Sequence, residues 1–95
     1  MIESDYFKPF NETIKEANIF LAHKNIRGWL WHQTGRIMPL IPTDEDLEWI
    51  ADVLWSTAYT LNSKLESYEQ YELCQKVTNQ LELLSTEINQ IQKSR

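Results

Sequence analysis

Glycine and proline are rare in this 95-residue chain, and their positions limit the folds that it can adopt. Only two glycines and three prolines occur, and four of these five residues lie in the stretch from Gly28 to Pro42. A β-sandwich or a β-barrel needs turn residues between many short strands, so this composition argues against both. Residues 43–95 contain neither residue type, which favours long helices. We therefore predict an all-α fold, a small helical bundle in a single domain over residues 1–95.

Three main helices are expected, with an irregular aromatic segment between the first two. The first helix is predicted to start near Pro9, because proline is tolerated in a first helical turn, and to end near His23. Residues 1–8 are expected to form a short lead-in turn. Within residues 26–42 we expect at most a short helix around Trp29–Gln33, capped by Gly35, followed by an extended stretch before the prolines.

The second helix has a clear predicted start. Thr43 is in the N-cap position, and the acidic run that follows it, Asp44 to Asp46, suits the positive end of the helix dipole. Its end is less marked, and Ser63-Lys64-Leu65-Glu66 fits a capping box for a third helix. We predict a break near Asn62–Ser63, with a continuous helix as the alternative. The third helix is expected to reach about Gln92 and to form an antiparallel hairpin with the second.

Apolar residues in the C-terminal helix recur in steps of three and four from Cys74 onward. This heptad period favours packing against another helix, and it predicts a buried, inert Cys74 thiol. Leu73 and Leu83 widen the stripe, so the second helix is expected to cover only part of it. We therefore predict a homodimer, and the alternative is a monomer in which the first helix covers the stripe. The predicted dimer interface consists of Val77, Leu81, Leu84, Ile88 and Ile91.

Charge is distributed unevenly along a chain whose formal net charge is −5. Residues 17–43 contain no acidic residue and carry a net charge of +3, whereas residues 44–95 carry −6. Tryptophan and arginine are frequent at the centres of protein interfaces, so this basic, aromatic segment is the predicted binding surface for a protein partner with an acidic groove. The alternative is that its tryptophans belong to the core and its arginines pair with neighbouring acids. The predicted partner-binding residues are Lys24, Arg27, Trp29, Trp31, His32 and Arg36.

Signs of catalysis or of metal binding are scarce in the sequence. No glycine-rich phosphate loop and no nucleophile-elbow motif occurs. His23, His32 and Cys74 do not have a zinc-ligand spacing, and the acids that follow Thr43 are explained by a helix N-terminus. We therefore expect a protein without enzymatic activity, cofactor or bound metal.

One stretch nevertheless resembles part of an enzyme family. The run from Leu47 to Trp55 is locally similar to the second acidic helix of the MazG-type nucleotide pyrophosphohydrolases. That resemblance implies an all-α enzyme that holds Mg²⁺ with carboxylates from successive helices. Glu48 and Asp52 are four residues apart where the family pattern has three, and the earlier glutamate cluster is reduced to Glu12 and Glu16. A small magnesium-dependent nucleotide hydrolase is therefore one alternative function.

A second alternative is an acidic inhibitor that imitates nucleic acid through glutamates off the apolar stripe, namely Glu66, Glu69, Glu72, Glu82 and Glu87. The acidic charge disfavours nucleic acid itself as a partner.

The single cysteine, the acidic N-terminus and the lack of an apolar run of about 18–20 residues favour a cytoplasmic protein outside the membrane. The leading prediction is a small cytoplasmic, non-enzymatic interaction or regulatory protein.

Overall fold

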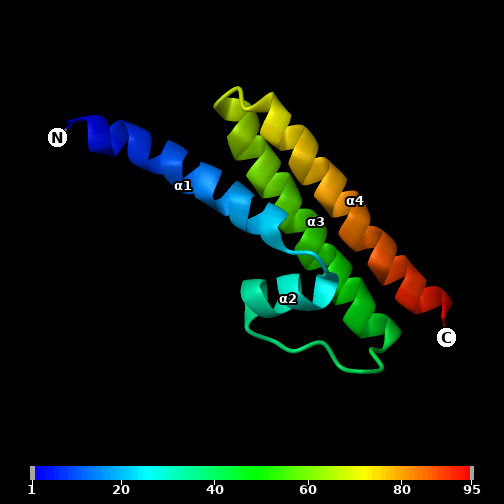
Figure 1. Cartoon of the computed structure of the whole chain (residues 1–95). Helices are drawn as coiled ribbons and strands as arrows, with labels where there is room; N and C mark the ends of the chain where they lie inside the picture. The colour runs from blue at the N-terminus through cyan, green and yellow to red at the C-terminus, as the bar shows by residue number, and fades with distance from the viewer. Residues whose placement is uncertain (1, 95) are drawn as a thin grey trace.

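Four helices make up the computed structural model, which describes the backbone of residues 2–94 and the side chains of residues 7–94. They are α1 (Ile2–Ala22), α2 (Ile26–Thr34), α3 (Asp44–Ser67) and α4 (Tyr71–Lys93) (Figure 1). The described residues contain no strand, so the all-α prediction is confirmed. The number of helices differs from the predicted three because the aromatic segment contains a regular helix of nine residues.

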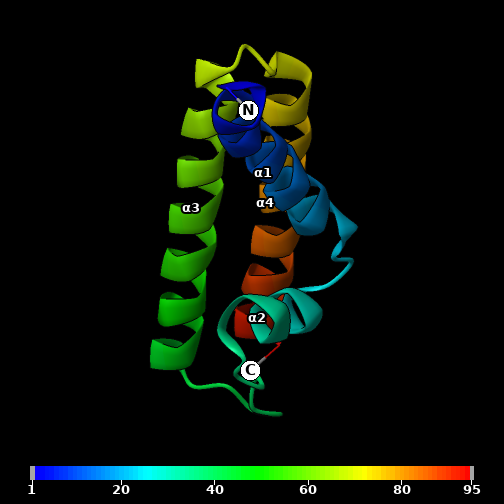
Figure 2. The same cartoon turned by 90° about the vertical axis from the view of Figure 1, so that its left-hand side faces the viewer.

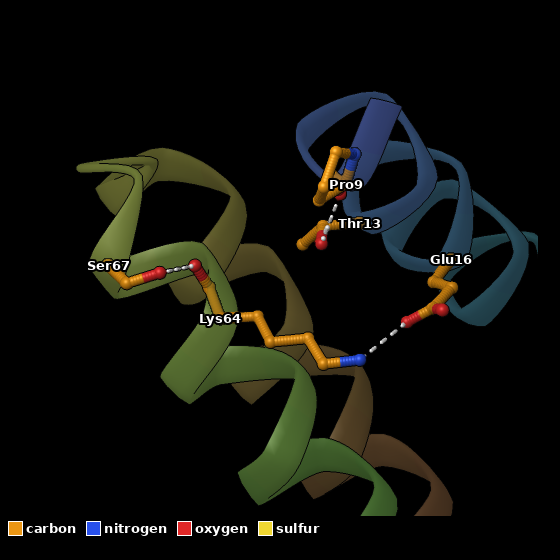
Figure 3. A network of polar contacts seen from close by, with 5 residues as sticks. All are labelled: Pro9, Thr13, Glu16, Lys64 and Ser67. Carbon is orange, nitrogen blue, oxygen red and sulfur yellow. Dashed lines mark hydrogen bonds and ion pairs between the residues drawn. The ribbon is translucent and has the colours of Figure 1, made fainter. Parts of the chain in front are cut away.

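Helix α1 begins earlier than the sequence suggested. It starts at Ile2, so Pro9 lies inside the helix and the lead-in turn predicted for residues 1–8 is wrong. A proline inside a helix cannot donate the backbone hydrogen bond to the residue four positions earlier. Pro9 is exposed, so water can reach this part of the helix. The Thr13 hydroxyl donates to the Pro9 carbonyl (2.9 Å), which gives that carbonyl a local partner (Figure 3).

Helix α2 is short and is capped at both ends. The Asn25 side-chain oxygen accepts a hydrogen bond from the Gly28 backbone N–H (2.7 Å), which satisfies one of the free donors of the first turn. At the other end Gly35 has a φ of 69°, and its N–H donates to the Trp31 carbonyl (2.8 Å). Glycine suits this left-handed position because it has no Cβ. The predicted short helix with a Gly35 cap is therefore confirmed.

Helix α3 starts where the sequence predicted and ends later. Thr43 and Asp46 form a capping box, in which the Asp46 N–H donates to the Thr43 hydroxyl (3.1 Å) and the Thr43 N–H donates to the Asp46 carboxylate (2.8 Å). The helix continues through Asn62–Ser63 to Ser67, so the break predicted there is wrong. The chain reverses at Glu69, which adopts a left-handed φ of 58°, and the Gln70 N–H donates to the Leu65 carbonyl (2.9 Å).

Helices α3 and α4 form an antiparallel hairpin, and the other two helices cover one side of it. Figure 1 shows α1 crossing the hairpin obliquely, and Figure 2 shows α2 in front of the C-terminal end of α4. Helices α1 and α2 are joined by a tight corner at residues 23–25. The hairpin, α1 and α2 enclose one core, which is made of Ala17, Phe20, Ile26, Trp29, Leu30, Met38, Leu47, Ile50, Leu54, Ala58, Leu61, Leu65, Val77, Leu81, Leu84 and Ile88. None of the described helices is long and apolar enough to cross a bilayer.

Candidate functional site

The two tryptophans of α2 have opposite environments. The Trp29 side chain is 1% exposed and packs edge-to-face on Phe20, with ring centroids 6.3 Å apart. Trp31 is two residues further along the helix and is 57% exposed. Trp29 therefore lies in the core, with almost no surface accessible to a partner protein, whereas Trp31 lies on the surface. Lys24 and His32, two further members of the predicted surface, are exposed.

Arg27 is exposed but its guanidinium is engaged. Its Nη1 donates to the backbone carbonyl of Met38 (3.1 Å) and to that of Pro39 (3.4 Å). These carbonyls belong to the segment between α2 and α3, residues 35–43, which we call the display loop. A charged donor makes stronger hydrogen bonds than a neutral one, so Arg27 ties the display loop to α2.

Arg36 ties the display loop to α3. Its guanidinium carbon lies 4.6 Å from the centre of the Trp49 ring, which is the geometry of a cation–π contact. The Arg36 N–H also donates to the Thr34 hydroxyl (3.1 Å) at the end of α2. Both arginines of the predicted surface therefore have a structural role beside their charge.

The display loop contains buried residues that anchor it to the core and exposed apolar residues that face solvent. Met38 is buried in the core, and Pro42 is buried beside the start of α3. Ile37, Leu40 and Ile41 are 81%, 91% and 85% exposed. Sequence reasoning missed these three residues because an extended segment between prolines has no helical period from which to assign an inner and an outer face. Large aliphatic side chains this exposed, gathered in one loop, are typical of an interaction site.

The apolar stripe of α4 is covered within the single chain. Val77, Leu81, Leu84 and Ile88 are all buried against the rest of the core, and Ile91 is partly buried. Most of the predicted interface is thus covered by the chain itself, and only Ile91 keeps part of its surface accessible. Self-association through this stripe stays a prediction. Cys74, at the N-terminal end of the stripe, is only partly buried. This partial burial raises the pKa of its thiol, and the negative charge of Glu66 raises it further.

The carboxylates proposed for a magnesium site do not converge. Glu48 and Asp52 are exposed on α3, and Glu12 and Glu16 are exposed on α1. Glu16 instead forms an ion pair with Lys64 (3.7 Å), which links α1 to α3 (Figure 3). Among the residues with described side chains, no group of three or more His, Cys, Asp or Glu is placed to hold a metal ion.

Helix α4 holds the corner between α1 and α2 through two polar side chains. The Glu87 carboxylate accepts from the Ile26 backbone N–H (3.1 Å), at the first turn of α2. The Gln80 amide donates to the His23 carbonyl at the end of α1. Glu87, one of the glutamates considered for nucleic-acid mimicry, is therefore occupied inside the fold.

A half-open cavity of about 480 Å³ lies between α1, α2 and α3. Its apolar residues are Ile19, which is partly exposed, and Phe20, Trp29 and Leu61, which are buried in the core. His23 and His32 line it together, with ring centroids 4.9 Å apart. Burial, and then the neighbouring His32, lower the pKa of His23. Sequence reasoning noted both histidines but did not bring them together, because His23 lies in the corner after α1 and His32 lies in the last turn of α2.

Comparison of the chain with protein-family models, with curated proteins and with solved structures found no match. Function therefore has to be argued from the surfaces and the cavity described above.

Proposed function

We propose that this protein is a non-enzymatic interaction protein that binds an apolar groove, rimmed by carboxylates, on a partner protein. The observation that carries the proposal is the exposure of Ile37, Leu40 and Ile41 in the display loop. Apolar side chains exposed in one place raise the free energy of the unbound protein in water, and a partner that covers them removes this penalty. Trp31, on the helix that leads into the loop, adds a large aromatic side chain of the kind that dominates interfaces.

The anchoring of the display loop supports the same proposal. Its backbone is tied to α2 by Arg27 and to α3 by Arg36, and its middle is fixed by the buried Met38. A loop that is already ordered loses less conformational entropy on binding than a free one. The apolar side chains are thus presented on a prearranged backbone.

Charge supports an acidic rim on the partner. Residues 17–43 contain no acidic side chain, and Lys24, Arg27 and Arg36 all precede the exposed apolar residues in the sequence. Charges at the edge of an interface mainly steer association and select the partner, while the apolar centre supplies most of the affinity. Association through this surface should therefore slow at high salt.

The test compares a double substitution of exposed apolar residues in the display loop with a single control substitution on α4. The variant L40S/I41S removes apolar surface from the display loop, and L83S removes a similarly exposed leucine from α4. Each tagged protein is used to capture partners from native lysate, and the retained proteins are quantified by mass spectrometry. We expect a partner that wild type and L83S retain and that L40S/I41S loses, with unchanged circular dichroism in all three. Equal retention by L40S/I41S would contradict the proposal.

A photo-crosslinking residue then locates the contact directly. Placed at position 40, it should form an adduct with the captured partner, and placed at position 83 it should not. The partner's crosslinked peptide should lie in an apolar groove with Asp or Glu at its edge. A crosslink to a basic or uniformly polar surface would argue against the assigned partner chemistry.

A further inference from the structure

We propose that the cavity between α1, α2 and α3 is a binding site for a small organic carboxylate that carries an aromatic or bulky apolar group. The site is distinct from the display loop, so this inference goes beyond the proposed interaction function. Its volume, about 480 Å³, lies in the range of small-molecule sites. It combines an apolar floor with a few polar groups at one side, which is the usual composition of such sites.

The floor of the cavity suits a flat apolar group. Phe20, Trp29 and Leu61 are each less than 5% exposed, so they are held in place by the core around them. The edge of the Phe20 ring meets the Trp29 ring nearly at a right angle (82°). The partly exposed Ile19 adds accessible apolar surface to this lining. A ligand ring placed in the cavity would be desolvated without any rearrangement of the core, which favours binding.

The two histidines supply the polar side of the cavity. The imidazoles of His23 and His32 make no hydrogen bond to any side chain or backbone atom in the part of the chain that the structure describes. Their ring centres are 4.9 Å apart, which is close enough for the two oxygens of one carboxylate to accept a hydrogen bond from each ring. Both imidazoles are accessible to solvent, and beside the apolar floor they offer hydrogen-bond donors to a ligand that carries an acceptor.

The charges around the histidines favour an anionic ligand over a cationic one. On α1, Glu16 lines the cavity, but its carboxylate pairs with Lys64 of α3 (3.7 Å). On α4, the Glu87 carboxylate is occupied by the Ile26 N–H. Lys24, the residue after His23 in the sequence, adds a positive charge. The remaining local charge is therefore positive once an imidazole takes up a proton.

Binding of a carboxylate should accordingly draw a proton onto the histidines. Burial keeps the pKa of His23 low in the free protein, so its imidazole is neutral at pH 7.5. A carboxylate within hydrogen-bond distance stabilises the protonated ring and raises that pKa. An uncharged ligand of the same shape would take up no proton.

Three compounds that share one ring system test whether the cavity prefers an anionic, a neutral or a cationic ligand. 2-Naphthylacetate carries the carboxylate, 2-naphthylacetamide is its neutral counterpart, and 2-(2-naphthyl)ethylamine is the cation. Isothermal titration calorimetry at pH 7.5 should show the carboxylate binding at least about tenfold more tightly than the amide and the amine, which corresponds to one charge-assisted pair. Titrations in phosphate and in Tris, which differ in ionisation enthalpy, should show proton uptake with the carboxylate alone.

Two sets of variants locate the site. H32Q changes an exposed residue and H23Q a partly buried one. Each should reduce the carboxylate's affinity to that of the amide and abolish proton uptake. K24Q is the control for the loss of a positive charge beside the cavity. S56W should block the cavity, whereas S63W places the same bulk on an exposed position of α3 outside it. If H23Q fails to fold, H32Q alone decides the role of the pair. Absence of binding by all three compounds, equal binding of carboxylate and amide, or unchanged binding in H32Q or S56W would each overturn the proposal.

Discussion

Replacing each tryptophan of α2 by alanine should separate folding from partner binding. Trp29 and Trp31 lie two residues apart, yet one is 1% exposed and the other 57%. We predict that W29A destabilises the fold severely and that W31A leaves it nearly unchanged while weakening partner capture. The two substitutions remove the same atoms from the same helix, so each serves as the control for the other.

The magnitude follows from burial. A fully buried tryptophan removes about 200 Å² of surface from water, and at about 25 cal/mol per Å² this corresponds to about 5 kcal/mol. Measured truncations of buried aromatic residues cost about 3–5 kcal/mol, and part of the loss here is the edge-to-face contact with Phe20. A domain of this size has a total stability of about 5–14 kcal/mol. W29A should therefore remove about a fifth or more of the free energy of unfolding, whereas W31A should cost about 1 kcal/mol or less.

Urea denaturation followed by circular dichroism at 222 nm measures both changes. With an m-value of about 2 kcal/mol per molar urea, a loss of 4 kcal/mol lowers the midpoint by about 2 M, and a loss of 1 kcal/mol lowers it by about 0.5 M. If W29A unfolds within about 1 kcal/mol of wild type, Trp29 does not fill the core in the way described. If W31A costs as much as W29A, the assignment of Trp31 to the surface is wrong.

Three further predictions concern stability. T43A removes the hydroxyl that accepts from the Asp46 N–H at the start of α3 and should cost about 1 kcal/mol, a fall in melting temperature of about 4–8 °C, whereas T60A should not. L84D places a carboxylate in the core and should unfold the monomer, as judged by size-exclusion chromatography and circular dichroism, while L83D on the exposed side should not. Because the pKa of His23 is lowered in the folded protein, the unfolded chain binds the proton more tightly. Stability should thus fall as the pH drops below about 6.5, and urea midpoints at pH 7.5 and 5.5 should differ less in H23Q than in wild type.

Much of the fold could be predicted because its helix ends are encoded locally. Thr43 with the acids after it determines the start of α3, and Gly35 determines the end of α2, because each supplies a side chain or a backbone conformation that the helix end requires. The ends that were predicted wrongly depend on more than local preference. Pro9 suits a first turn but is also accepted inside α1, and Ser63 suits a cap but continues a helix whose core residues Leu61 and Leu65 lie one turn apart.

The residue types indicated which segment forms the candidate site, but not which of its side chains face the core and which face solvent. Tryptophan and arginine mark an interface equally well whether they face inward or outward, so composition alone could not separate Trp29 from Trp31. The helical register does separate them, since Ile26, Trp29 and Leu30 have the i, i+3, i+4 spacing of one buried face. This buried face can be recognised only when the segment from Ile26 is known to be helical despite Gly28. The histidine cavity could not be predicted, because it depends on how α1 and α2 meet.

The double role of the arginines determines how charge substitutions in this region must be interpreted. Arg27→Glu reverses one charge and also places a carboxylate against the carbonyl oxygens of Met38 and Pro39, so it would repel the display loop from α2. Loss of partner binding in that variant could therefore come from a displaced loop as well as from lost attraction. Lys24→Glu reverses the charge of an exposed side chain outside the loop and leaves its anchors intact. If charge steers the partner, Lys24→Glu should slow association and leave dissociation nearly unchanged, whereas Arg27→Glu should also speed dissociation.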